Sequence, residues 1–264
     1  MSKYGVFLLI FLLPLPASGQ VRNWDLNVFT GTQVKGENNQ IKDKTSSLMK
    51  LYHDRVASQK DLINGREYVP YFWRSETTPL LNSGEEMLST LIINGRRYEN
   101  IRLLYDTFLD ELIYIDTTRM INFQYPRIVL NKDDVDEAIF NIKGEKMEFR
   151  HLRFKGDQSN GLQDGYYEIV SEGSTRFIIR HHSAEYTKDA VNEYHYLPGK
   201  YFYIGGKYHN IKTMKDLLTL CGDKSPELKD FIRSSRIKVR RADKRQMAEV
   251  LKKYELLTGT ATSK

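Results

Sequence analysis

Paired turn residues recur between short runs of aromatic and β-branched residues from Asp61 to Ile211. Two-residue turns of this kind connect the strands of antiparallel hairpins, and Asn-Gly is their strongest signal. The sequence therefore predicts an antiparallel β meander of about ten strands, closed as a barrel or folded as a sandwich. The turn pairs are Asn64-Gly65, Asn94-Gly95, Lys143-Gly144, Glu172-Gly173 and Gly205-Gly206.

The apolar period changes from two to three or four residues over 212–258, which predicts about three helices and an α+β fold. The first helix should start near Met214 and end at Gly222. Ser225 should cap the second helix, and Asp243 should cap the third. The second and third helices should pack on the β domain through Leu228, Phe231, Ile232, Val250, Leu251 and Tyr254.

The N-terminus has the three parts of a secretory signal. Lys3 is the only charge before Arg22, and an almost wholly apolar run from Gly5 to Pro16 follows it. Ala17 and Gly19 then offer small residues to a signal peptidase. The run is shorter than the roughly 20 apolar residues that span a bilayer. We therefore expect export, cleavage near Gly19, and a periplasmic or extracellular protein that is not an integral membrane protein.

The rest of the chain divides by composition. Residues 20–60 form a polar lead-in with a short amphipathic helix over Thr45–Lys60, and 61–211 form the β domain. Residues 212–258 form a basic helical tail, and 259–264 should fray. Cys221 is the single cysteine, so no internal disulfide exists, and its helical position predicts that the thiol is buried.

The positive charge of the chain is concentrated in the tail. From Lys200 onward there are 16 basic and 7 acidic residues, whereas residues 20–199 hold 23 basic and 27 acidic residues. Such a patch either contacts an anionic surface or is a solvated helix face. Nucleic acid is not an expected partner of an exported chain without a recognised binding motif. The candidate contact residues are Arg233, Arg236, Lys238, Arg240, Arg241, Lys244 and Arg245.

No catalytic, cofactor or metal motif stands out in the sequence. His181 and His182 should point to opposite sides of a strand, although one of them could form a cross-strand metal site with His195 or His209. The acidic residues from Asp133 to Glu137 lack the glycine of a calcium loop and fit a short helical turn opened by Asn131.

Asp106 and Asp110 are expected to hydrogen-bond the turn between two strands rather than to form a protease site. Two aromatic groups, Tyr71-Phe72-Trp73 and Tyr166-Tyr167, could form a binding platform for sugar or peptide, but cross-strand packing is the commoner role of such residues.

Several short motifs together resemble a family of uncharacterised exported proteins of Bacteroidetes-type bacteria. The motifs run from Asp61-Leu62-Ile63-Asn64-Gly65-Arg66-Glu67-Tyr68 and Pro79 through Asn94-Gly95, Tyr98, Asn100, Leu104-Tyr105-Asp106, Asp110, Leu112, Gly165-Tyr166-Tyr167 and Tyr201-Phe202-Tyr203 to Glu227-Leu228-Lys229 and Phe231-Ile232-Arg233. The resemblance implies export and a Gram-negative envelope, and it implies no activity.

Two classes of function fit these features. The first is a non-catalytic binding or structural module of the envelope, with an envelope protein, a glycan or an anionic lipid surface as its partner. The second is an extracytoplasmic hydrolase with an unrecognised site. An enzyme needs titratable groups that converge in one pocket, whereas a binding module does not.

Overall fold

The computed structural model describes residues 47–48, 60–71, 75, 77–154, 161–188 and 191–259. All of these except 47–48 belong to one compact unit, His53–Lys264. The predicted signal peptide, nearly all of the lead-in and residues 260–264 lie outside the described residues. Of the helix predicted over Thr45–Lys60, residues 47, 48 and 60 are described, and they are helical. No helix in the described ranges is long and apolar enough to cross a membrane.

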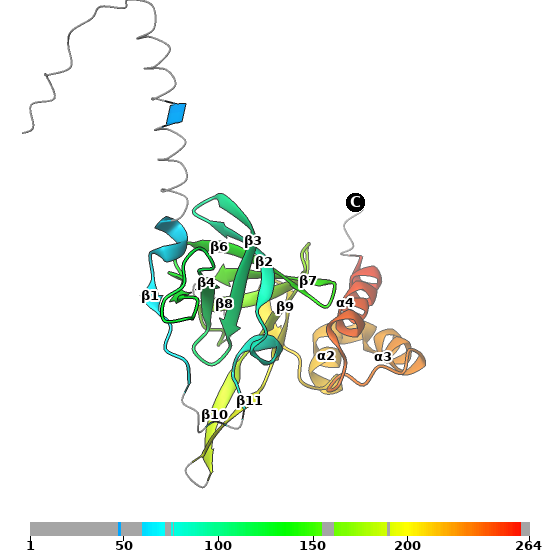
Figure 1. Cartoon of the computed structure of the whole chain (residues 1–264). Helices are drawn as coiled ribbons and strands as arrows, with labels where there is room; N and C mark the ends of the chain where they lie inside the picture. Colours follow the sequence, from blue (N-terminus) through cyan, green and yellow to red (C-terminus); the bar gives the residue numbers. More distant parts are fainter. Residues whose placement is uncertain are drawn as a thin grey trace, which may run out of the picture. The chain divides into compact units, whose positions relative to one another are not determined.

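The chain has an α+β fold in which antiparallel strands predominate (Figure 1). Eleven strands form one sheet in the order β1-β5-β4-β3-β2-β6-β7-β8-β9-β12-β13, and β10 and β11 form a separate two-stranded ribbon. The strands are β1 (Arg66–Glu67), β2 (Met87–Ile93), β3 (Arg96–Asp106), β4 (Glu111–Ile115), β5 (Arg127–Val129), β6 (Val135–Ile142), β7 (Glu145–Leu152), β8 (Gly165–Ser171), β9 (Arg176–Arg180), β10 (Ser183–Lys188), β11 (Val191–Tyr196), β12 (Gly199–Ile204) and β13 (Lys207–Asn210).

The large sheet is open, with β1 and β13 as its edge strands. It is therefore neither the closed barrel nor the two-sheet sandwich that the sequence left as alternatives. Hydrogen bonding continues without a break from β5 through β2 and β6 to β9 and β12, so these strands belong to one continuous sheet and not to two stacked sheets. A large twisted sheet curls instead of stacking as two halves.

Local turn chemistry produces most of the hairpins. Asn94-Gly95 joins β2 to β3 with φ of 49° and 73°, and Lys143-Gly144 and Gly205-Gly206 join their strands with the same positive-φ geometry. The hairpin predicted at Asn64-Gly65 is wrong. A Cβ on Gly65 would lie 1.8 Å from the Val129 carbonyl oxygen, so this glycine allows the chain to approach β5 closely before it pairs as β1.

The sheet curls so strongly that strands distant in its order meet through their side chains. The Tyr105 ring on β3 lies 5.3 Å from Phe149 on β7 and 6.1 Å from Tyr166 on β8, between ring centroids. These rings belong to one buried cluster that fills the inside of the curl. The concave face of β2 to β8 therefore forms the first hydrophobic core.

Three helices follow the sheet: α2 (Met214–Cys221), α3 (Ser225–Ser234) and α4 (Lys244–Thr258), with a 3-10 turn at Gly222–Lys224. Asp243 caps α4, as predicted, and it also forms a capping box with Gln246. The predicted cap at Ser225 is wrong. Because α3 continues directly from the 3-10 turn, Ser225 is its first residue and donates its hydroxyl to the carbonyls of Leu218 and Gly222.

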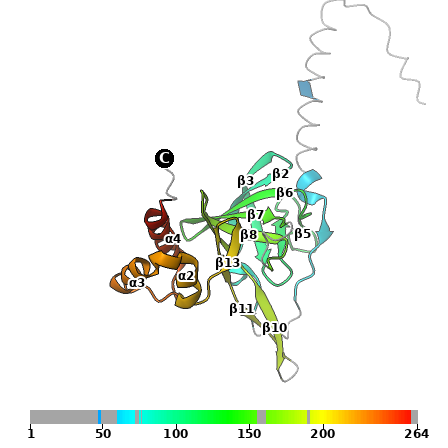
Figure 2. The ribbon, with the colours of Figure 1, turned by 180° about the vertical axis from the view of Figure 1, so that it is seen from behind.

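The helices pack on β9 and β12 and form a second core. Phe177 and Phe202 from the sheet lie in one cluster with Leu228 from α3 and Val250 from α4. The helices form one group beside the sheet in both views (Figures 1 and 2). Cys221 is buried in this core as expected, and burial raises the pKa of its thiol to about 11.

The Asp110 carboxylate fastens the turn between β3 and β4 to β8. It accepts hydrogen bonds from the Tyr105 hydroxyl (2.7 Å) and the Tyr166 backbone N–H (3.3 Å), and it pairs with the Lys132 ammonium (2.6 Å). A Cβ on residue Gly165 would lie 2.4 Å from the Asp110 Oδ2, so only glycine allows this approach. The carboxylate thus holds the two sides of the curl together.

We predict that Asp110→Ala lowers the free energy of unfolding by about 2–4 kcal/mol, because it leaves a buried hydroxyl, a backbone N–H and an ammonium without their acceptor. Urea denaturation measures this change. The matched control is Asp133→Ala, which removes an exposed ion pair with Arg153 and should cost at most about 1 kcal/mol. Equal effects of the two variants would show that Asp110 does not hold the curl.

Candidate functional site

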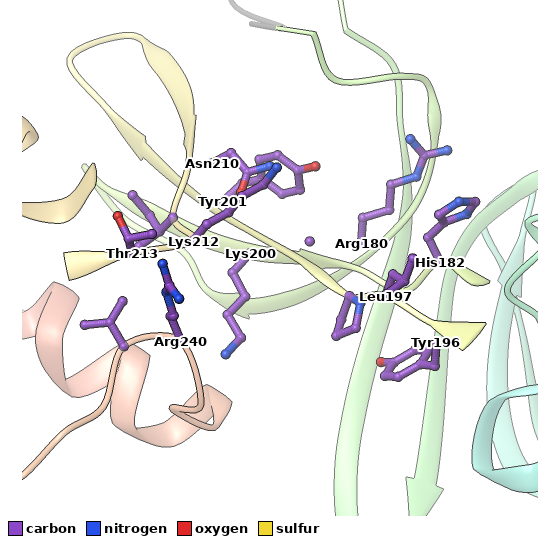
Figure 3. Close-up of a pocket in the computed structure, with 14 residues that line it drawn as sticks. Arg180, His182, Tyr196, Leu197, Lys200, Tyr201, Asn210, Lys212, Thr213 and Arg240 are labelled. Carbon is purple, nitrogen blue, oxygen red and sulfur yellow. The ribbon is translucent and has the colours of Figure 1, made fainter. Parts of the chain in front are cut away.

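A cleft of about 750 Å³ lies where the sheet meets the chain that leads into α4 (Figure 3). The chain that follows β9 and β11, the first residues of β12, the end of β13 and the connection between α3 and α4 surround it. Its lining residues are Arg180, His182, Tyr196, Leu197, Pro198, Gly199, Lys200, Tyr201, Asn210, Ile211, Lys212, Thr213, Val239 and Arg240.

The charge of the cleft is entirely positive. Its lining holds four cationic side chains and one histidine but no aspartate or glutamate. In Figure 3, Arg180 and His182 lie toward one end, and Lys200, Lys212 and Arg240 lie toward the other. A concave surface lined by one sign of charge concentrates the electrostatic field and attracts ligands of the opposite sign.

Two of the four cations are free to bind. The Lys200 ammonium donates to the Ala242 carbonyl, and burial lowers its pKa against the opposing charge of Asp243. Arg180 donates one N–H to the Gln163 side chain at 3.1 Å. Within the described part of the chain, none of the four cations forms a salt bridge, and Lys212 and Arg240 are exposed; the charge of Lys212 also interacts with the Asp216 carboxylate, which accepts the Lys212 backbone N–H.

A chain of polar groups, buried at His181 and Glu168, supports the cleft from behind. The Tyr196 hydroxyl, in the cleft wall, bonds to Nδ1 of His181 at 2.5 Å. Nε2 of His181 lies 2.9 Å from one oxygen of the Glu168 carboxylate, and the Lys244 ammonium lies 2.7 Å from the other oxygen. The chain therefore runs from the wall of the cleft to the first residue of α4.

Strand alternation places Glu168 between the two hydrophobic cores. On β8, Tyr166, Glu168 and Val170 share one face, since alternate residues of a strand point the same way. Tyr166 belongs to the core inside the curl, and Val170 packs against the core under the helices. The cross-strand neighbours of Glu168 are Phe149 on β7 and Ile179 on β9, one from each core.

The Glu168 carboxylate stays ionised at this buried position. Burial by itself raises its pKa, but the hydrogen bonds and charges of His181 and Lys244 outweigh burial and hold the pKa below its ordinary value. The side chain is only 3% exposed, so a charge here is stable only while both partners are present.

Tyr196, His181 and Glu168 have the order of a nucleophile, a base and an orienting acid, but two features of their surroundings differ from those of an activated nucleophile. Burial, followed by the Glu168 charge, raises the pKa of Tyr196, whereas an activated nucleophile needs a lowered one. His181 is 5% exposed and does not line the cleft. The arrangement therefore holds the cleft wall and the helices in place, and His181 does not face the cavity.

The seven basic residues predicted as contacts for an anionic surface lie on and after α3. Six of them are exposed: Arg233, Arg236, Lys238, Arg240, Arg241 and Arg245. Of the seven, only Arg240 lines the cleft. The Lys244 ammonium pairs with Glu168 and Glu145 and is largely enclosed, so it holds the fold together and is the least available to an external anion.

The other residues that the sequence singled out as candidates make contacts that stabilise the fold. His195 lies beside Glu193 and the Tyr186 ring, not beside His181. Among the described residues, no three His, Cys, Asp or Glu side chains come together in a way that could hold a metal ion. The short turn predicted at Asn131 is present as a single hydrogen-bonded turn: the Asp134 N–H donates to the Asn131 carbonyl, and β6 begins immediately afterwards at Val135.

Asp106 behaves as predicted, because its Oδ1 accepts the backbone N–H groups of Phe108 and Leu109 in the β3–β4 turn. The proposed aromatic platform at Tyr166-Tyr167 is wrong. The two rings are 1% and 0% exposed and lie in different cores, since neighbouring strand residues face opposite ways. Phe72 and Trp73 lie outside the described residues.

Sequence reasoning missed Arg180, Lys200 and Lys212 as members of the cleft. They lie far apart in the sequence and meet Arg240 only because β12 pairs with both β9 and β13. No periodic signal marks them, although Arg180 ends β9, Lys212 follows β13 and Lys200 lies at the start of β12, close to loops, which commonly carry binding residues.

No protein-family model, curated protein or solved structure was found to match this chain. The fold and the cleft are therefore the basis for any statement about function.

We predict that Glu168→Gln destabilises the protein by about 3 kcal/mol near pH 7, because it leaves Lys244 and His181 without their carboxylate. The folded-state pKa of Glu168 lies below the ordinary value of 4.5. The contribution of the carboxylate to the free energy of unfolding is therefore complete above about pH 4.5 and is lost as the pH falls through the folded-state pKa. Thermal unfolding from pH 7 to pH 3 measures the difference between wild type and variant, which should shrink below about pH 4.5.

The control for this pH series is Glu99→Gln, which removes an exposed ion pair with Arg97. It should have little effect at any pH. A Glu168→Gln difference that stays constant down to pH 3 would mean that the carboxylate is not held ionised by its partners.

Proposed function

We propose that this chain is an exported, non-catalytic binding module of a bacterial envelope that holds an anionic group of its ligand in the basic cleft. One observation carries the proposal. Four cations and no acid line a concave site, none of the four forms a salt bridge within the described part of the chain, and two of them, Lys212 and Arg240, are exposed.

The N-terminal sequence supports the cellular setting. Lys3, the apolar run after it and the small residues Ala17 and Gly19 fit a secretory signal, and the motif resemblance implies a Gram-negative envelope. Envelopes of this kind are rich in acidic glycans and anionic headgroups, so the setting and the charge of the cleft agree.

The shape and lining of the cleft favour an acidic saccharide as ligand. A flat lipid surface cannot enter a concave site, whereas a chain of sugar rings can. Tyr196, Leu197, Pro198 and Tyr201 offer apolar and aromatic surface next to the cations. Sugar rings pack their C–H faces on such surfaces, while arginine and lysine bind the carboxylate or phosphate groups of the same ligand.

The second candidate is an extracytoplasmic hydrolase, and the alignment of Tyr196, His181 and Glu168 is the observation in its favour. It ranks below the binding module because the pKa of Tyr196 is raised and because His181 does not line the cleft. Tyr196→Phe separates the two candidates: a binding module keeps the aromatic ring and the cations and so loses only the part of its affinity that depends on the anchored wall, whereas a hydrolase with a tyrosine nucleophile loses all turnover.

We predict that an oligogalacturonate binds the protein and that the double variant Lys212→Gln/Arg240→Gln binds it roughly tenfold or more weakly, because charge-assisted hydrogen bonds are lost. Isothermal titration calorimetry measures the affinity. Binding should weaken with salt, since the screening length falls from about 10 Å at 0.1 M to about 3 Å at 1 M. A neutral galacto-oligosaccharide of the same length should bind weakly or not at all.

The matched control is Arg233→Gln/Arg236→Gln, which removes the same charge from the tail outside the cleft. It should bind like the wild type. Equal losses in both double variants would point to the whole basic tail as a diffuse contact surface. No binding of the acidic oligosaccharide by the wild type would reject the proposal.

A further inference from the structure

The loop between β4 and β5 exposes an unusual amount of apolar surface at its tip. Four of the side chains in this loop, Met120, Ile121, Phe123 and Tyr125, are 57%, 54%, 96% and 39% exposed. Isolated exposed apolar residues are ordinary, but a cluster on one short loop marks an interaction site. We call residues 117–126 the apolar loop.

The tip of the apolar loop is a rigid turn with a strained residue. Ile121 and Gln124 exchange two backbone hydrogen bonds of 2.9 Å, and the two residues between them have positive φ, 48° for Asn122 and 62° for Phe123. In three other two-residue hairpin turns of the described chain, glycine occupies the second position, at Gly95, Gly144 and Gly206. A bulky residue with φ near 60° is a conformational outlier, and its free-energy cost is similar to that of a lost hydrogen bond.

Within the described part of the chain, burial of the Phe123 side chain does not offset this strain, because that residue is 96% exposed. Neither turn geometry nor core packing therefore explains a phenylalanine at this position. Strained residues that persist in folded proteins cluster at functional sites, so the inference runs from the outlier to a binding role.

Hydrogen bonds of Asp116 hold the base of the apolar loop in place. The buried Asp116 accepts hydrogen bonds from the backbone N–H of Thr118 and from the Arg119 guanidinium (2.8 Å). Its own N–H donates to the Pro126 carbonyl at 2.9 Å. The exposed tip is thus a preorganised projection, and its binding would cost little conformational entropy.

Three features select a lipid bilayer as the occupant. The loop from 117 to 126 holds one cation, Arg119, and no acid. Its apolar side chains come from both arms and from the tip, which suits a fluid apolar phase that surrounds a projection better than a shaped protein pocket. The paired backbone bonds at Ile121 and Gln124 satisfy polar groups that could not otherwise enter hydrocarbon.

We infer that the apolar loop inserts its tip into the interfacial region of a membrane, with Phe123 deepest and Tyr125 and Arg119 at the level of the headgroups. Aromatic and basic residues prefer that level. One loop with four apolar side chains supports weak, reversible association. The inference does not rest on the cleft, which is formed by other elements of the sheet.

Flotation of the intact mature protein with vesicles of pure zwitterionic phosphatidylcholine tests this inference. The wild type should float with the vesicles, and the bound fraction should be the same at 0.1 M and 1 M salt, because insertion is apolar. Phe123→Gly should reduce the partition coefficient about tenfold, as expected from the apolar area of one phenylalanine. Glycine also relieves the strain at positive φ, so the variant should unfold at an equal or higher temperature.

Leu256→Ala is the matched control, because it removes an exposed apolar side chain of α4 that is 61% exposed. It should float like the wild type. Phe123→Trp should also float, and its added fluorescence should shift to the blue and be quenched by lipids brominated near the headgroup.

Four results would overturn the inference. The first is a wild type that does not float, and the second is equal flotation of wild type and Phe123→Gly. The third is binding that requires anionic lipid and fades with salt. The fourth is a concentration-dependent dimer in sedimentation that Phe123→Gly abolishes, which would make a second copy of the chain the occupant, with the neighbouring hollow beside Glu67 and Glu86 as its seat.

Discussion

The ionised Glu168 carboxylate joins the two halves of this fold. It lies on β8 where the core inside the curled sheet ends and the core under the helices begins, and its charge is shared by Lys244 at the start of α4 and His181 after β9. A buried charge is costly unless each oxygen has a partner. The helices and the sheet must therefore keep one relative position for the carboxylate to stay paired.

That fixed position creates the cleft. Lys244 anchors the end of the α3–α4 connection, and the residues just before it, Val239 and Arg240, form one wall. Through His181, the same carboxylate holds the hydroxyl of Tyr196 in the opposite wall. The polar chain thus shapes the site from behind, with Tyr196 as its member in the cleft wall and His181 and Glu168 outside the lining.

Local chemistry made much of the fold predictable. Asn94-Gly95 and Gly205-Gly206 determine their own turns, and the capping box of Asp243 determines the start of α4 regardless of distant contacts. The prediction failed at Asn64-Gly65, where the glycine serves a close approach to Val129 that only the folded chain reveals. The sequence also did not decide whether the sheet closes into a barrel, because the pairings of β2 with β6 and of β9 with β12 join segments that no local signal connects.

The site was harder to predict than the fold. Arg240 was a candidate because it stands in a dense basic run, but Lys212 and Arg180 carry no such mark in the sequence. Glu168 and His181 look like ordinary strand residues until β8 and β9 place them between two cores. The contact of Glu168 with the distant Lys244 and the position between two cores, not residue type, give these groups their role.

The most direct measurement of the central claim is a crystal structure of the mature protein with selenate diffused into the crystal, since the anomalous signal of selenium locates the anion. The account predicts a selenate in the cleft within hydrogen-bond distance of Arg240 and Lys212, with the Glu168–Lys244 pair intact behind it. Selenate bound only elsewhere, or Arg240 and Lys212 each paired with an acidic side chain across an empty cleft, would contradict it.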